Sequence, residues 1–149
     1  MGTSFGVSTA YLCETNPDAK ITSIEGEKEI YNVAKNSLDY KNLSLINENI
    51  DDWFTKIKPQ MFDCIIIDAN HTYEATLRYF SIALKTLKNG GFIIFDDIYW
   101  SKGMTLAWDK IVKSEKVNIT IDLFAFGIVF IRPTQNKEHF ILRTFQLLN

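Results

Sequence analysis

Apolar residues follow two different spacings along the chain, and these spacings predict strands and helices in turn. Short, nearly continuous apolar runs predict strands at residues 20–24, 43–46, 62–67 and 92–95. The last two runs are apolar at almost every position, as expected for strands buried on both faces of a parallel sheet. Helices are predicted where apolar residues recur three or four positions apart: 7–16, 27–38, 50–57, 77–87 and 104–112.

Two further apolar segments, at about 119–124 and 128–132, lie on either side of Gly127. The connection between them is too short for a helical crossover, so these strands are expected to be antiparallel. The order of elements predicts an α/β fold, a doubly wound, Rossmann-like and mostly parallel sheet that ends in this reversed C-terminal hairpin. The segment from Glu138 to Leu148 is also apolar, and its pattern does not distinguish helix from strand.

The chain begins with a glycine-rich turn, Gly2-Thr3-Ser4-Phe5-Gly6, directly before the first predicted helix. Glu25 follows at the end of the next predicted strand, about 20 residues further on, which is the spacing of a nucleotide-like cofactor site. In such sites the glycines let the backbone approach the ligand, and the carboxylate takes the two ribose hydroxyls. Either feature alone has a structural explanation, as a tight connection or a solvated helix start. Together they favour a cofactor site.

A strand is expected to lead into this turn, but Met1 stands where its last residue would be. We therefore expect a single domain over residues 1–149 that lacks its N-terminal first strand. That strand would lie in the middle of the sheet, where unmatched backbone groups cost roughly 1–3 kcal/mol each if buried. The chain is predicted to be marginally stable alone, or to close the gap with a partner chain, for example in a homo-oligomer.

Polar residues also follow the two most apolar strands, at the edge where ligands bind to such sheets. Asp68 ends the run at 62–67, and His71 comes three residues later. This pair offers a proton acceptor, a metal ligand and a hydrogen-bonding ring. Capping of the next helix explains some polar residues here, but it does not need a histidine. Asp68 and His71 are therefore candidate catalytic residues, whereas His139 is interpreted as structural.

Asp96 and Asp97 follow the strand predicted at 92–95, and adjacent carboxylates repel each other unless a cation or donors are near. With Asp68 they could supply three oxygen ligands to a hard cation such as Mg²⁺ or Ca²⁺. Alternatively, one carboxylate faces solvent and the other caps the next helix. The aromatic pair that comes next is a candidate wall for a substrate or an adenine: Tyr99 and Trp100.

Composition limits the partners and the compartment. The formal net charge of −2 and the pI near 5.7 argue against nucleic acid or an anionic membrane as a partner. No apolar stretch approaches the ~20 residues of a membrane span, and the first residues do not form the pattern of a signal peptide. Cys13 and Cys64 are interpreted as buried free thiols, which is typical of a cytoplasmic protein.

Taken together, these segments resemble the class I S-adenosylmethionine-dependent methyltransferases of the O-methyltransferase-like branch, over essentially the whole chain. Residues 65–73 resemble the family's Asp-Gly-x-His-x-Tyr segment, and residues 90–97 resemble its Gly-Gly-x-x-x-x-Asp-Asp segment. The resemblance implies methyl transfer from S-adenosylmethionine to a small-molecule acceptor. The atom that receives the methyl group is expected to be an oxygen. It also implies a set of cofactor-binding residues: Gly2, Thr3, Ser4, Phe5, Gly6, Glu25, Gly26, Asn49, Ile50 and Asp68.

The resemblance also implies that Asp68 lies beside the methyl-transfer site and that His71 is the base. A divalent cation held by Asp68, Asp96 and Asp97 would lower the pKa of an acceptor hydroxyl. Ala69 departs from the family's glycine and would crowd the cofactor or shift the loop. Two alternatives stay open, namely a non-catalytic relative that binds the cofactor or a partner, and an NAD-dependent oxidoreductase, which shares the glycine turn and Glu25.

Overall fold

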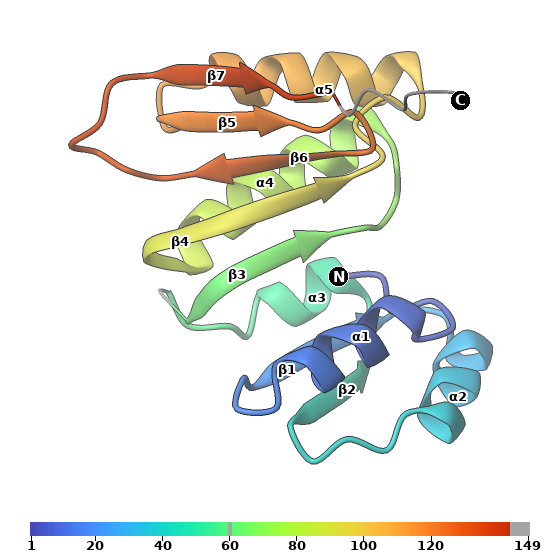
Figure 1. Cartoon of the computed structure of the whole chain (residues 1–149). Helices are drawn as coiled ribbons and strands as arrows, with labels where there is room; N and C mark the ends of the chain where they lie inside the picture. The colour runs from blue at the N-terminus through green and yellow to red at the C-terminus, as the bar shows by residue number, and fades with distance from the viewer. Residues whose placement is uncertain (60, 144–149) are drawn as a thin grey trace, which may run out of the picture. The chain divides into compact units, whose positions relative to one another are not determined.

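A computed structural model describes residues 1–59 and 61–143, in which helices and strands alternate along most of the chain (Figure 1). The chain forms two compact units, Met1–Ile57 and Lys58–Asn149. Among the described residues, no helix is long and apolar enough to cross a membrane. The single domain expected over residues 1–149 stays a prediction.

In the first unit, a helix connects a parallel pair of strands. β1 pairs with β2 in register, so that Glu25 and Asn47 lie opposite each other at the carboxyl end of the pair. α1 packs on β1, and α2 packs on both strands. The elements in chain order are α1 (Val7–Thr15), β1 (Ile21–Glu25), α2 (Lys28–Ser37), β2 (Leu43–Asn47) and α3 (Ile50–Phe54).

Local chemistry decides where these helices begin. Gly6 precedes α1 with a φ of 89°, a left-handed conformation that favours glycine. A Cβ atom there would also lie 2.8 Å from Cδ1 of Leu38. Asn49 begins α3, because its side chain accepts a hydrogen bond from the backbone amide of Asp51. The helix predicted over 50–57 is shorter than expected and ends at Phe54.

The second unit is a five-stranded sheet with the strand order β3-β4-β6-β5-β7. β3 and β4 are parallel, β6 is antiparallel to both β4 and β5, and β7 lies parallel to β5 at the edge. The predicted reversed hairpin is therefore confirmed as β5 and β6. The elements are β3 (Phe62–Ile67), α4 (Tyr73–Thr86), β4 (Leu87–Asp96), α5 (Lys102–Lys113), β5 (Ile119–Asp122), β6 (Phe126–Phe130) and β7 (Glu138–Ile141).

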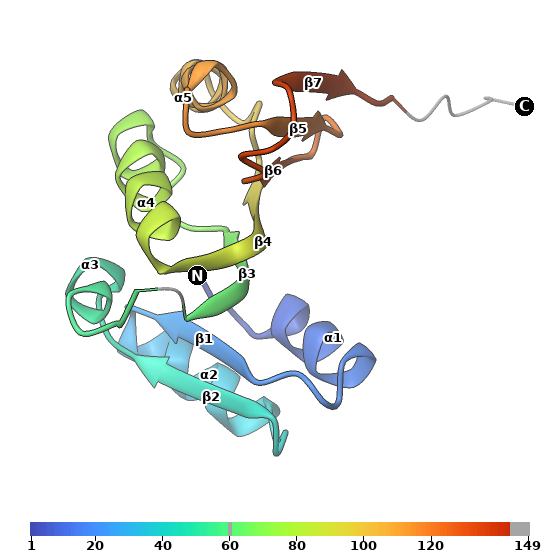
Figure 2. The ribbon, with the colours of Figure 1, turned by 90° about the vertical axis from the view of Figure 1, so that its left-hand side faces the viewer.

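Both helices of this unit cover the same face of the sheet (Figure 2). Alternate strand residues that point to this face are fully buried, as for Ile93, Phe95 and Val129. Their neighbours on the other face, such as Ile94 and Ile128, are only half-buried. The expectation of strands buried on both faces is therefore wrong for this unit, because α4 and α5 pack on one side.

The boundary between α4 and β4 also differs from the prediction. Leu87 was expected on the helix, but its backbone is extended (φ −73°, ψ 136°) and it pairs with Phe62 as the first residue of β4. The glycine pair that follows, Gly90-Gly91, lies inside the strand. Glycine is needed there, since a Cβ atom at Gly91 would lie 2.7 Å from the Asp63 carbonyl oxygen.

The α/β class and the Rossmann-like order of elements are confirmed, but hydrogen bonds join the described strands into two sheets, β1–β2 and the five-stranded sheet. Among the described residues, no strand precedes α1. The apolar tail forms β7 over Glu138–Ile141, and its predicted end at residues 144–148 lies outside the described residues.

Replacement of Gly6 tests the start of α1. We expect Gly6→Ala to lower the free energy of unfolding by about 1–3 kcal/mol, because alanine is strained at positive φ and its methyl group meets Leu38. Chemical denaturation measures this loss. Gly26→Ala is the matched control, since the nearest heavy atom to a Cβ there is 4.0 Å away and its φ is ordinary. Equal losses in both variants would contradict the conformational role of Gly6.

Candidate functional site

The glycine turn before α1 is held against the end of β1. The backbone amides of Gly2 and Thr3 both donate to the Ile24 carbonyl oxygen, at 3.1 and 3.2 Å. Three residues of the turn have positive φ, namely Gly2 (85°), Ser4 (50°) and Gly6 (89°). This curvature leaves the side chains of Ser4 and Phe5 exposed.

A buried cluster of hydroxyl groups lies beneath this turn. Oγ of Ser23, in β1, lies 2.7 Å from Oγ1 of Thr3 and 3.1 Å from Oγ1 of Thr9. All three residues are buried, so the cluster satisfies polar groups that would otherwise lack partners. No role was predicted for Ser23, although a serine in a strand that also holds Ile21 and Ile24 is a usable signal.

The structure brings Glu25 and the glycine turn together, as their spacing predicts. Oε2 of Glu25 accepts a hydrogen bond from the Ser4 amide at 2.9 Å, and Oε1 accepts one from the Glu27 amide at 3.0 Å. The carboxylate therefore connects the turn to the start of α2. Each oxygen keeps a second lone pair for a further donor such as a ribose hydroxyl.

The residues predicted to flank an adenine lie at the end of β2. Asn49 caps α3, and Ile50 is the half-buried first residue of that helix. Asn47, the last residue of β2, has a supporting role. Its Nδ2 donates to the carbonyl oxygens of Glu25 and Gly26, at 2.8 and 3.3 Å, and so fixes the backbone beside the carboxylate.

In the second unit, Asp68 directly follows β3 and lies close to His71. Asp68 Oδ1 is 3.4 Å from Nε2 of His71, and both side chains are partly exposed. Asn70, at a φ of 54°, turns the chain between them and donates to the Tyr79 hydroxyl at 2.7 Å. Thr72 then caps α4. Capping thus accounts for Thr72 but leaves Asp68 and His71 available for chemistry.

Asp96 ends β4 beside the same group of residues. Burial raises the pKa of the Asp96 carboxyl, and the negative charges of Asp68 and Asp97 raise it further. A backbone hydrogen bond from Asp97 and the charge of His71 offset part of this rise. Asp97 has a φ of 53°, and its carbonyl oxygen accepts the Trp100 amide at 2.9 Å. Excess negative charge therefore gathers at this end of the sheet.

The predicted cation site does not fit this arrangement. The described part of the chain contains no group of three His, Cys, Asp or Glu residues that could hold a metal ion. The charges of Asp68 and Asp97 raise the pKa of Asp96, but the three carboxylates do not form such a group. We therefore derive no metal-dependent step.

A family model described as a methyltransferase domain matches residues 1–98, which is more than half of the chain. The chain belongs to this methyltransferase family. The resemblance seen in the sequence is therefore confirmed, and the match includes both the glycine turn and the Asp96-Asp97 pair. No curated protein matches the sequence significantly.

Several solved structures share the fold of this chain. An O-methyltransferase from Bacillus cereus, in complex with SAH, has 19% identity and a TM-score of 0.71, covering 88% of this chain and 71% of that chain. TomG, an O-methyltransferase from Streptomyces achromogenes in complex with SAM, has 18% identity and a TM-score of 0.71. The match covers 87% of this chain and 70% of TomG. The cofactor-bound protein Rv0187 from MTB has 18% identity and a TM-score of 0.74. The match covers 91% of this chain and 71% of Rv0187.

The charge around Asp96 predicts a pH-dependent stability. Because the folded state raises the pKa of Asp96, the ionised carboxyl destabilises the fold above the ordinary carboxyl pKa. Asp96→Asn should therefore raise the free energy of unfolding at pH 7, by about 0.5 kcal/mol after allowance for solvent screening. The gain should shrink as the pH falls and disappear once Asp96 is protonated in both states.

Chemical denaturation at pH 7 and pH 3 measures the effect of Asp96→Asn. The control is Asp109→Asn, which removes an exposed carboxylate on α5. If Asp96→Asn destabilised the protein at pH 7, the excess negative charge would not be the dominant influence on this residue.

Proposed function

We propose that this protein binds S-adenosylmethionine and transfers its methyl group to an oxygen atom of a small-molecule acceptor. The observation that carries the proposal is the contact between the glycine turn and Glu25, in which a strained, partly exposed backbone lies beside a carboxylate. Membership of the methyltransferase family supports it. So do the complexes of similarly folded O-methyltransferases with SAM and SAH.

Each part of the first unit has a proposed role toward the cofactor. Residues 2–6 would surround its methionine portion, where positive φ values let the backbone approach a ligand. Glu25 would accept the ribose hydroxyls with its remaining lone pairs, while Gly26, Asn49 and Ile50 would contact the nucleoside. Asn47 would act indirectly, because it holds the backbone of Glu25 and Gly26.

The second unit would supply the chemistry. The donor carries its methyl group on a sulfonium, so the enzyme needs to align the acceptor oxygen with the methyl–sulfur bond and remove a proton. His71 is the proposed base, and Asp68, 3.4 Å away, would stabilise the imidazolium that results. No protein–substrate covalent bond is required in this sequence of events.

A non-catalytic role is the second candidate, and one observation favours it. Both oxygens of Glu25 already accept backbone amides, so the carboxylate has a structural task without any ligand. Ala69, which stands where the family has glycine, also favours a non-catalytic role. Family membership argues against the NAD-dependent oxidoreductase.

The cytoplasmic location and the oligomeric state are also proposals. The two cysteines are free, and burial raises the pKa of the Cys64 thiol to about 11, so it is protonated and unreactive at neutral pH. Free thiols fit a reducing cytoplasm, although Cys64 is half-buried where full burial was expected. A homo-oligomer stays part of the proposal, because a partner chain could cover unpaired strand edges.

Cofactor binding can be tested without knowledge of the acceptor. S-adenosylhomocysteine at 100 times its dissociation constant should stabilise the wild type by about 2.7 kcal/mol, a rise of several degrees in Tm. Glu25→Gln should weaken binding at least about tenfold, since an amide accepts hydroxyls less well than a carboxylate. Calorimetric titration measures both affinities.

Glu27→Gln is the matched control for Glu25→Gln, because it changes an exposed carboxylate two residues away whose side chain does not cap α2. Its affinity for S-adenosylhomocysteine should equal that of the wild type. A folded wild type whose Tm does not respond to the ligand would contradict cofactor binding.

Catalysis is tested by the rate of S-adenosylhomocysteine formation from S-adenosylmethionine over a panel of small hydroxyl compounds. With any acceptor that turns over, His71→Asn should lower kcat by about 10²–10⁴-fold, as expected for loss of a general base, and should leave cofactor affinity unchanged. Cofactor binding without turnover of any acceptor would favour the non-catalytic role. An unchanged kcat would exclude His71 as the base.

A further inference from the structure

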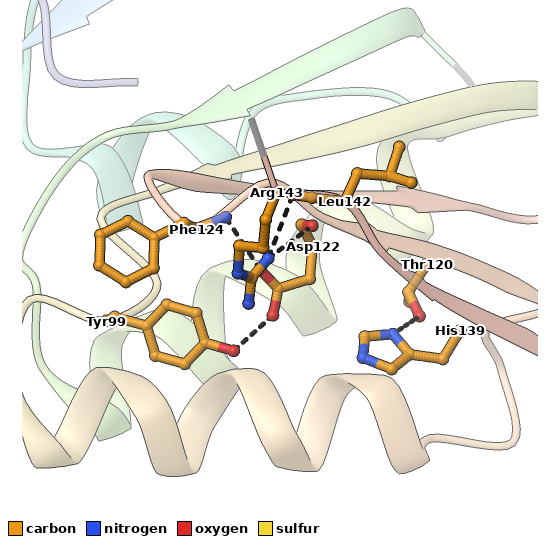
Figure 3. A network of polar contacts seen from close by, with 7 residues as sticks. All are labelled: Tyr99, Thr120, Asp122, Phe124, His139, Leu142 and Arg143. Carbon is orange, nitrogen blue, oxygen red and sulfur yellow. Dashed lines mark hydrogen bonds and ion pairs between the residues drawn. The ribbon is translucent and has the colours of Figure 1, made fainter. Parts of the chain in front are cut away.

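One carboxylate that the proposed chemistry does not use joins three segments of the second unit. Asp122, at the end of β5, is fully buried (0% exposed) and accepts a hydrogen bond from the Tyr99 hydroxyl (Figure 3). Its Oδ1 also accepts the Phe124 amide at 2.9 Å and the Arg143 guanidinium at 2.8 Å. Its backbone carbonyl oxygen accepts the Leu142 amide at 2.9 Å.

These contacts satisfy a buried charge. Burial alone would raise the pKa of Asp122, but the hydrogen bonds from Tyr99, Arg143 and the Phe124 amide, together with the Arg143 charge, hold it below its usual range. The carboxylate is therefore ionised at neutral pH. Because an ionised, buried carboxylate is costly without its partners, each partner is held firmly in place.

The sheet topology places this network at the edge that carries the proposed chemistry. β4 and β5 are both antiparallel to β6, so they run in the same direction and end at the same edge. Asp96 lies opposite Phe126 across the β4–β6 pair. Tyr99 follows Asp97 by two residues, and the Trp100 amide closes the turn onto the Asp97 carbonyl oxygen. The Tyr99 hydroxyl thus connects the Asp97–Trp100 loop to β5.

Aromatic rings surround this connection. The rings of Tyr99 and Phe124 lie 5.6 Å apart, and the Arg143 guanidinium lies 5.8 Å from the Phe124 ring. Phe124 has a φ of 72°, which is a strained value for a bulky side chain, yet 62% of the residue is exposed. Burial does not explain this strain. The hydrogen bond from the Phe124 amide to Asp122 holds the conformation.

We propose that Asp122 is a positioning residue for methyl transfer, which holds the Asp97–Trp100 loop through Tyr99 and the exposed ring of Phe124 beside it. The proposal rests on the proposed function, since it assigns this loop to the acceptor side of that reaction. Asp122 itself touches neither substrate nor cofactor. Its effect reaches the reacting groups only through the loop that begins at Asp97.

Three variants separate this role from a general structural one. Tyr99→Phe removes only the hydroxyl that bonds Asp122, and Asp122→Asn removes the charge. The matched control is Thr120→Val, which also breaks a polar contact of a buried β5 residue, the 2.7 Å contact to Nδ1 of His139 on β7. That contact does not involve the loop. Tyr99→Phe keeps the test valid if Asp122→Asn fails to fold.

The readout is the ¹⁹F NMR spectrum of the protein labelled with 5-fluorotryptophan. Trp100, on the loop, is 72% exposed, whereas Trp53 and Trp108 are 8% and 2% exposed, so the three resonances report different environments. We expect the Trp100 resonance, assigned with Trp100→Phe, to shift by more than its line width in Tyr99→Phe and Asp122→Asn. Thr120→Val should leave it in place. Affinity for S-adenosylhomocysteine should stay within about twofold of the wild type in Tyr99→Phe.

An unmoved Trp100 resonance in Tyr99→Phe, or an equal shift in Thr120→Val, would overturn the role of Asp122 even if the wild type binds S-adenosylhomocysteine. Loss of that binding in Tyr99→Phe would also overturn it, because the network would then serve the cofactor site or the whole fold. Failure of the wild type itself to bind would overturn the proposed function, and this role with it. The two failures are therefore distinguishable.

Discussion

Loops at the carboxyl end of a sheet need acceptors for their backbone amides, and in each unit a strand-terminal carboxylate supplies them. Glu25 ends β1 and accepts the amides of Ser4 and Glu27. Asp122 ends β5 and accepts the Phe124 amide, with Tyr99 and Arg143 as further donors. Each of these hydrogen bonds fixes a loop amide at the end of its strand, so the loop conformations depend on these carboxylates.

The two carboxylates differ in their remaining capacity to accept hydrogen bonds. Glu25 is half-buried and accepts hydrogen bonds from two backbone amides, so its oxygens keep capacity for the hydroxyls of a ligand. Asp122 is fully buried and surrounded by donors, which leaves it a structural task. The same chemical group thus keeps acceptor capacity in one unit and only fixes loop geometry in the other, because solvent exposure differs.

Asp96 behaves differently again, because burial and the negative charges of Asp68 and Asp97 raise the pKa of its carboxyl. Charge that is not compensated within a fold is typical of functional sites. O-methyltransferases share this fold at 18–19% identity, so the fold tolerates wide sequence variation.

The sequence alone determined the α/β class, the reversed hairpin, and the meeting of the glycine turn with Glu25, because these follow from local periodicity and from short connections between neighbouring elements. It placed Asp68 and Asp96 together correctly, since both end neighbouring parallel strands. Only the tertiary structure decided that Leu87 belongs to β4 and that Tyr99 and Arg143 converge on Asp122. These contacts join residues 21 to 25 positions apart across different elements, and such pairing leaves no periodic signal in the chain.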